Sequence, residues 1–155
     1  MGKSCIVNEA EFVASSGPVV KAQPMNEIQT IDIDAVEAHM LTLPQIEIPV
    51  EHIFGPGIYI RQGLLPAGYI IMGHHHKIPC LNMLLTGKMA LLEGGSMREI
   101  TAPYIFTTKD GRKTAYMMED CVFQNIYATE ETDLNKLEEM CVEKSSAYKE
   151  IAKCG

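Results

Sequence analysis

Residues 68–87, GYIIMGHHHKIPCLNMLLTG, decide the fold of this chain. Apolar and β-branched residues dominate positions 69–71 and 81–85, and a short stretch with a proline separates them at 77–79. This pattern predicts two strands joined by a short loop, with the second strand ending at a turn made by Gly87.

Consecutive histidines end the first predicted strand. Because side chains alternate along a strand, we expect His74 and His76 to share one face and His75 to point the other way, toward solvent. Cys80 follows shortly after them. Imidazoles and a thiol are ligands for transition metals, so these residues predict part of a metal site. The alternative is that the histidines only hydrogen-bond inside a barrel and that Cys80 is a small buried apolar residue.

The spacing of these residues resembles the first signature of the cupins, which is a glycine, five residues, His-x-His, three or four residues, a glutamate, six residues and a glycine. Gly68, His74, His76 and Gly87 match it, and Cys80 stands where the family has its glutamate. The resemblance implies a mainly β fold, with a single cupin-type β-barrel, also called a double-stranded β-helix or jelly roll.

The rest of the chain agrees with this fold class. Short alternating segments at regular spacing predict barrel strands over residues 29–128, including 30–34 and 45–51, while 35–43 fits either a helical turn or a strand. Residues 1–28 predict an N-terminal extension, either a flexible arm or one packed on a partner subunit. Residues 129–155 predict an amphipathic C-terminal α-helix, with a break near 145–146 as an alternative.

A metal-binding cupin completes its site with a histidine from a second signature. The corresponding turn here is at 109–111, and Thr114 stands in place of that histidine. Tyr116 and Tyr127 are the candidate substitutes, as ligand or substrate contacts. His39 and His52 lie upstream of the first signature and are weaker candidates for ligands.

Residues 110–131 also resemble small cupins encoded in bacteriophage and prophage genomes. The shared features are a turn, a basic pair, a Glu-Asp turn, an Asn-Ile strand end and a Glu-Thr-Asp-Leu helix start. This resemblance implies a location in the cytoplasm of a bacterial host. Those relatives tend to carry histidine where this chain has Cys80 and Tyr127, so the chain departs from their metal chemistry.

A further resemblance is to the thiol dioxygenases, cupins in which a cysteine replaces the signature glutamate and can cross-link to a tyrosine near the iron. Cys80 matches that cysteine, and Tyr116 or Tyr127 could be the tyrosine. Those enzymes hold Fe(II) with three histidines, whereas His74 and His76 are the only pair available here.

Composition narrows the possible functions. A chain of 155 residues suits one domain. A net charge of −7 argues against nucleic-acid binding, and no apolar run reaches the length of about 18 residues that a membrane span needs. The 5 cysteines form no CxxC pair, which fits a reducing cytoplasm.

The leading hypothesis is a small cupin, catalytic or not, that binds a divalent transition metal (Zn, Fe, Ni, Cu or Mn) through His74 and His76, with Cys80 nearby and a small molecule in the barrel mouth. The alternative is a metal-free, non-catalytic cupin that binds a ligand or serves as a phage assembly or host-interaction scaffold. A homodimer is a further prediction, because small cupins commonly pair through barrel strands.

Overall fold

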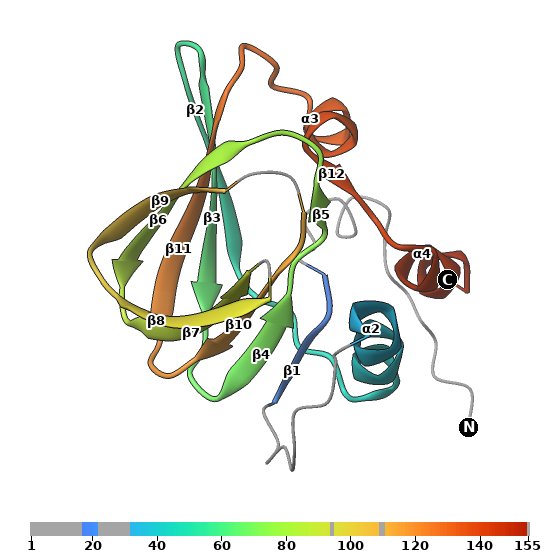
Figure 1. The fold of residues 1–155 in the computed structure, drawn as a ribbon. Coiled ribbons are helices and arrows are strands. Elements are labelled where there is room, and N and C mark those ends of the chain that lie inside the picture. The colour runs from blue at the N-terminus through green and yellow to red at the C-terminus, as the bar shows by residue number, and fades with distance from the viewer. Residues whose placement is uncertain (1–16, 22–31, 94, 109–110, 155) are drawn as a thin grey trace.

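A computed structural model describes residues 17–21, 32–93, 95–108 and 111–154. Its strands form two five-stranded antiparallel sheets that face each other (Figure 1). The first sheet contains, in spatial order, β1 (Val19–Lys21), β4 (Tyr69–Met72), β10 (Lys113–Met117), β7 (Lys88–Glu93) and β8 (Ser96–Thr101). The second contains β2 (Val50–Gly55), β3 (Ile58–Leu65), β11 (Cys121–Ala128), β6 (Cys80–Thr86) and β9 (Tyr104–Thr108).

The chain passes back and forth between the two sheets. From β4 onward the main strands alternate between the first sheet and the second, in the order β4, β6, β7, β9, β10 and β11. Strand β8 is an exception, because it follows β7 in the same sheet and forms a hairpin with it. This winding is a jelly roll, so the predicted fold class, a mainly β cupin-type barrel, is confirmed. None of the described helices is long and apolar enough to cross a membrane.

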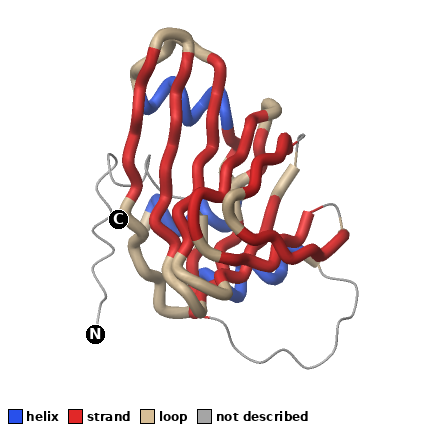
Figure 2. The backbone as a smooth tube through the Cα atoms, turned by 90° about the vertical axis from the view of Figure 1, so that its left-hand side faces the viewer, coloured by secondary structure: helices blue, strands red, loops and turns tan. Residues whose placement is uncertain are grey.

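Helices lie against one side of the barrel. They are α2 (Ile33–Thr42), α3 (Leu134–Cys141) and α4 (Ser146–Lys153). Seen from the side opposite the helices, the strands form the near wall of the molecule and the helices lie behind them (Figure 2). The predicted C-terminal helix is present but divided, because β12 (Val142–Glu143) follows α3 and pairs with β5 (His75–His76). Ser145 then caps α4 by accepting a hydrogen bond from Tyr148 N at 3.1 Å.

The strand predicted over residues 30–34 is wrong for the part that the structure describes. Asp32 is the N-cap of α2, and its Oδ1 accepts hydrogen bonds from Asp34 N at 3.1 Å and Ala35 N at 3.3 Å. Residues 30 and 31 lie outside the described part. The alternation of isoleucine and aspartate resembled a strand, but aspartate is also a strong helix cap. The segment 35–43, left open by the sequence, is mostly helix.

The strand predicted over 45–51 begins later than expected. Only Val50 and Glu51 belong to β2, which continues to Gly55. The Gln45 side chain instead accepts a hydrogen bond from Val19 N at 3.1 Å and donates to Met40 O at 2.7 Å. The segment before β2 therefore connects α2 to the barrel and is not a barrel strand.

The predicted extension contains a strand. Val19–Lys21 form β1, which pairs with β4 at the edge of the first sheet. Val20 packs with Met40 of α2 and Met72 of β4 in a small apolar cluster. The other residues of the range 1–28, apart from 17 and 18, lie outside the described part of the chain.

The barrel is filled unevenly. At one end a core of buried apolar side chains from both sheets closes the space between them: Leu65, Leu84, Met89, Leu91, Ile100, Phe106, Ala115, Met117 and Cys121. At the other end a second cluster joins the barrel to α3: Tyr59, Cys80, Tyr127, Leu137 and Cys141. Polar side chains are buried around this second end, and the candidate site is there.

A buried ion pair attaches the helices to the barrel. Arg112, just before β10, donates from Nη1 and Nη2 to the Glu37 carboxylate of α2 at 2.9 and 2.8 Å, and from Nε to Gly73 O at 3.0 Å. Glu37 is fully buried. Burial alone would raise the pKa of Glu37, but the hydrogen bonds from Arg112 and Ser145 outweigh it and lower the pKa. Glu37 therefore joins α2, the barrel rim and the cap of α4.

We predict that Glu37→Gln lowers the free energy of unfolding by about 3 kcal/mol at pH 7, because the Arg112 guanidinium loses its buried counter-ion. The folded-state pKa of Glu37 is lowered, so its contribution is present above the ordinary value of 4.5 and is lost as the pH falls through the folded-state pKa. The gap between wild type and variant should therefore narrow at acidic pH. Urea unfolding at pH 7 and at pH 3.5 measures both quantities.

The matched control is Asp34→Asn on the same helix. The Asp34 carboxylate is 91% exposed and lies 3.9 Å from Arg112 Nη1, so its loss should cost less than about 1 kcal/mol. Equal losses for the two variants would contradict the role assigned to Glu37.

Candidate functional site

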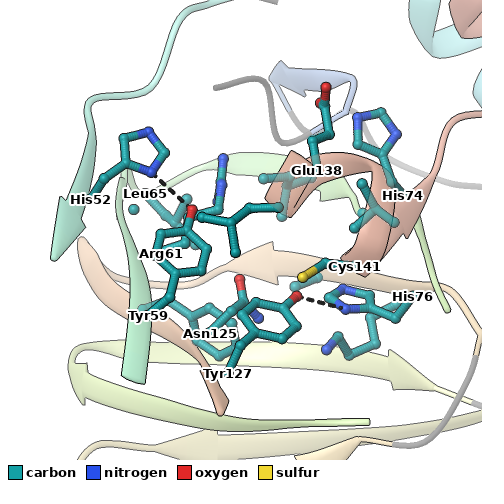
Figure 3. Close-up of a pocket in the computed structure, with 18 of the residues that line it drawn as sticks. His52, Tyr59, Arg61, Leu65, His74, His76, Asn125, Tyr127, Glu138 and Cys141 are labelled. Carbon is teal, nitrogen blue, oxygen red and sulfur yellow. Dashed lines mark hydrogen bonds between the residues drawn. The ribbon is translucent and has the colours of Figure 1, made fainter. Parts of the chain in front are cut away.

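A cavity of about 130 Å³ lies between the two sheets at the end covered by α3. Strands β3, β10 and β11 provide inward-facing side chains, and Leu137, Glu138 and Cys141 of α3 contribute from the other side. Figure 3 shows 18 of the residues that line it. Its polar lining includes His52, Arg61, His74, His76, Lys113 and Tyr127.

Two of the three consecutive histidines, His74 and His76, face inward as predicted. His74 and His76 are 5% and 7% exposed, whereas His75 is exposed. The strand is interrupted between β4 and β5, but the alternation of buried and exposed side chains continues through the interruption. The sequence therefore predicted which rings enter the barrel.

His74 has no hydrogen-bond partner among the described residues at either ring nitrogen. Its ring meets the Tyr148 ring of α4 edge-on, with centroids 4.6 Å apart. Burial, followed by the charges of Lys144 and Arg112, lowers the pKa of His74 to about 3. A neutral imidazole with two unsatisfied nitrogens can both donate a hydrogen bond to a bound molecule and accept one from it.

His76 is held by barrel residues. Its Nδ1 lies 3.2 Å from the Tyr127 hydroxyl and 3.8 Å from Cys80 Sγ. Burial, followed by the charge of Lys113, lowers the pKa of His76 to about 3. Burial raises the pKa of Tyr127, so its hydroxyl stays protonated. Figure 3 shows this hydrogen-bonded pair, with His74 set apart from it on the side of Glu138.

A lysine extends into the same region. Lys113 Nζ donates to Asn82 Oδ1 at 3.1 Å and to Thr108 Oγ1 at 3.0 Å. Asn125 Nδ2 also donates to Asn82 Oδ1, at 2.7 Å, and Cys80 Sγ lies 3.5 Å from Thr108 Oγ1. Asn82 and Thr108 are almost completely buried. Burial lowers the pKa of Lys113.

Arg61 of β3 supplies a second cation. Burial lowers its pKa, and the Glu138 carboxylate of α3 is among the groups that act in the opposite direction. Glu138 also forms an ion pair with Lys144, at 2.8 Å, and burial raises its pKa. On the other wall, His52 Nδ1 lies 2.8 Å from the Tyr59 hydroxyl. Arg61 and Lys113 outnumber Glu138, the one carboxylate among the described residues that line the cavity, so the lining carries an excess of positive charge.

The residues present do not fit a resident metal ion. Within the described parts of the chain, no group of three or more His, Cys, Asp or Glu side chains is placed to hold one. His74 stands apart from the His76–Tyr127 pair, and the Cys80 thiol contacts the same hydroxyl that accepts from the Lys113 ammonium. An ammonium beside these donors also repels a divalent cation.

Of the other candidate residues from the sequence, some line the cavity and some do not. Tyr127 and Cys80 lie in the site with His76, whereas Tyr116 is 40% exposed and points away from the cavity. His52 lines the cavity, and His39 is exposed on α2. Of the two tyrosines that the sequence offered as substitutes, Tyr127 lines the cavity and Tyr116 does not.

The sequence reasoning missed Lys113, and it weighed Arg61 as a contact for an anionic ligand but favoured a surface position for it. Lys113 shares its face of β10 with Ala115 and Met117, which are buried. That alternation was a usable signal, because Thr114 and Tyr116 then belong to the opposite face. Arg61 similarly shares its face of β3 with Tyr59 and Gly63, which are both buried.

No protein-family model matches the chain, and no curated protein is similar to it in sequence. Solved structures with a similar fold include a helix-turn-helix family transcriptional regulator from Vibrio cholerae, with 20% identity, a TM-score of 0.45 and coverage of 54% of this chain and 52% of that one. This chain therefore spans about half the length of that regulator.

Two further similar structures are cupins. An RmlC-like cupin family protein with a double-stranded β-helix fold from Methanocaldococcus jannaschii is 18% identical, with a TM-score of 0.45 and coverage of 59% of this chain and 85% of that one. A cupin superfamily protein from Desulfitobacterium hafniense is 9% identical, with a TM-score of 0.47 and coverage of 70% of this chain and 100% of that one. None of these likenesses bears on the activity of this chain.

Proposed function

We propose that this protein is a small, metal-independent cupin that binds a small carboxylate anion in its barrel cavity. The observation that carries the proposal is the placement of Arg61 and Lys113 in the wall of one small cavity. Among the described residues, Lys113 Nζ hydrogen-bonds only to the neutral groups of Asn82 and Thr108. A half-buried cation whose hydrogen bonds go to neutral groups favours an anionic ligand.

The size of the cavity limits the ligand. A dry protein cavity of about 150 Å³ accommodates a molecule the size of benzene, and this cavity measures about 130 Å³. Leu65, Met89, Leu91 and Leu137 supply an apolar part of its wall. The ligand is therefore a short carboxylate with a few carbon atoms, and the unsatisfied nitrogens of His74 provide a hydrogen-bonding position for a second polar group.

The sequence hypothesis of a divalent metal held by His74, His76 and Cys80 is the rival proposal. The unsatisfied nitrogens of His74 are the observation in its favour. The scaffold hypothesis, with a role in phage assembly or host interaction, is the other rival, and it requires no ligand. One set of measurements separates the three.

We predict that propionate, used as a probe, binds the full chain and that Lys113→Met weakens the affinity at least tenfold, about 1.4 kcal/mol, because the variant removes one buried cation. Isothermal titration calorimetry measures the affinity. The control is Lys136→Met, whose side chain is 68% exposed on α3 and whose loss should leave the affinity unchanged.

Metal content, measured by elemental analysis of protein purified without a histidine tag, should be far below one ion per chain, and chelator treatment should not change propionate binding. Stoichiometric metal that is lost in a His74→Ala/His76→Ala double variant would establish the metal-site rival. No binding of propionate and no metal would leave the scaffold rival.

We predict that propionate affinity is nearly constant from pH 5.5 to pH 7.5, because His74 and His76, with pKa values of about 3, are neutral throughout this range. At alkaline pH the affinity should decrease, and this decrease should begin at a pH below the ordinary lysine pKa of 10.5. The reason is that Lys113 loses its proton as the pH rises through its lowered pKa. Calorimetry from pH 5.5 to pH 10.5 tests both parts. A several-fold rise in affinity on acidification through pH 6.5 would contradict the neutrality of the histidines.

The predicted homodimer stays a prediction, as does the cytoplasmic, phage-encoded setting. The outer face of the second sheet is a candidate interface, because several large apolar side chains alternate there with inward-facing residues. Those at least 37% exposed are Ile53, Ile58, Leu64, Leu81, Leu85 and Ile105. Light scattering should give the mass of two chains, and a monomer at high concentration would refute the dimer.

A further inference from the structure

Lys113 lines the cavity, and barrel residues hold its amine. A lysine nitrogen can make three hydrogen bonds, and two are made with Asn82 and Thr108, which stand on β6 and β9 of the opposite sheet. The described residues provide no third bond to Nζ, and Lys113 lines the cavity. One direction of the nitrogen is therefore left for a bound molecule.

We propose that Lys113 forms a reversible Schiff base with a small oxo acid that binds in this cavity. The proposal rests on the proposed carboxylate site and names its ligand class more narrowly. Arg61, in the wall of the same cavity, supplies the positive charge for the ligand carboxylate. Desolvation of a lysine is one way to activate its amine toward a carbonyl carbon, and burial lowers the pKa of Lys113, which lies in the cavity wall with Nζ held by Asn82 and Thr108.

The reaction balances without another reagent. The ammonium first gives up one proton, and the nitrogen lone pair then forms a bond to the carbonyl carbon while the carbonyl oxygen takes up a proton to give a carbinolamine. The hydroxyl oxygen then takes up the proton that the ammonium released, the carbon–oxygen bond breaks, and water leaves. The sum is an ammonium plus a ketone giving a protonated imine plus water, so the net charge of the site is unchanged.

Two groups in the cavity wall can take part in the proton transfers with a bound oxo acid. The Tyr127 hydroxyl lies in the cavity wall, keeps its proton and is 3.2 Å from His76 Nδ1. His74 offers both a donor and an acceptor nitrogen with no other described partner. The retained positive charge of the imine continues to face Asn82 and Thr108, whose oxygens already accept from the lysine.

The test is reductive trapping with pyruvate, the smallest 2-oxo acid of the class. The full chain is incubated with pyruvate and cyanoborohydride, and the products are analysed by intact mass and peptide mapping. We expect one adduct per chain, with the mass of pyruvic acid less one oxygen atom, on the peptide that contains Lys113. Lys113→Arg should lose this adduct and keep a positive charge, whereas Lys136→Arg, an exposed control, should label as wild type does.

Propionate, which has a carboxylate but no carbonyl to attack, separates this inference from the proposed function. It should compete with pyruvate and reduce the labelling of Lys113. Propionate binding without an adduct on Lys113, or labelling spread over surface lysines and equal in Lys113→Arg, would overturn the Schiff base and leave the carboxylate site standing. Absence of both propionate binding and trapping would overturn the two proposals together.

Discussion

An ammonium group buried between two β-sheets has to be met by hydrogen-bond acceptors, and the polar interior of this barrel is arranged around that requirement. Lys113 enters from one sheet, and Asn82 and Thr108 meet it from the other. Asn125 shares the same amide oxygen. These contacts tie β10 to β6, β9 and β11 across the interior, at the end of the barrel that the apolar core does not fill.

The same cation adds to the effect of burial in lowering the pKa of His76, while Lys144 and Arg112 add to it at His74. Burial and nearby positive charges keep His74 and His76 neutral, and a carboxylate at the site, Glu138, is already engaged by Lys144. In the cupin signature that this chain resembles, a glutamate would stand at Cys80. Its replacement by a neutral thiol removes the negative charge that would attract a metal ion, and the lysine adds a positive charge in its place. Both changes favour an anion over a cation in the cavity.

The C-terminal segment completes the site. Leu137, Glu138 and Cys141 of α3 form one side of the cavity, and β12 pairs with β5, which carries His76. The buried pair of Glu37 and Arg112 supports this arrangement from outside, since Glu37 also contacts the residue that caps α4. Segments far apart in the sequence thus meet at the mouth of the barrel, which Figure 1 shows from the side.

The sequence by itself determined the barrel, the strands on either side of the histidines and the inward direction of His74 and His76, because strand alternation and glycine turns are local properties of consecutive residues. Its prediction of a strand over 30–34 was wrong for the described residues, because Asp32 caps α2, and that helix is stabilised by packing on the sheet. Only the tertiary structure showed that Lys113, and not Thr114 or Tyr116, enters the cavity and that its partners come from β6 and β9. The physical reason is that a charged group is buried at the expense of its hydration, and the acceptors that compensate for this loss belong to strands brought together only by the closure of the two sheets.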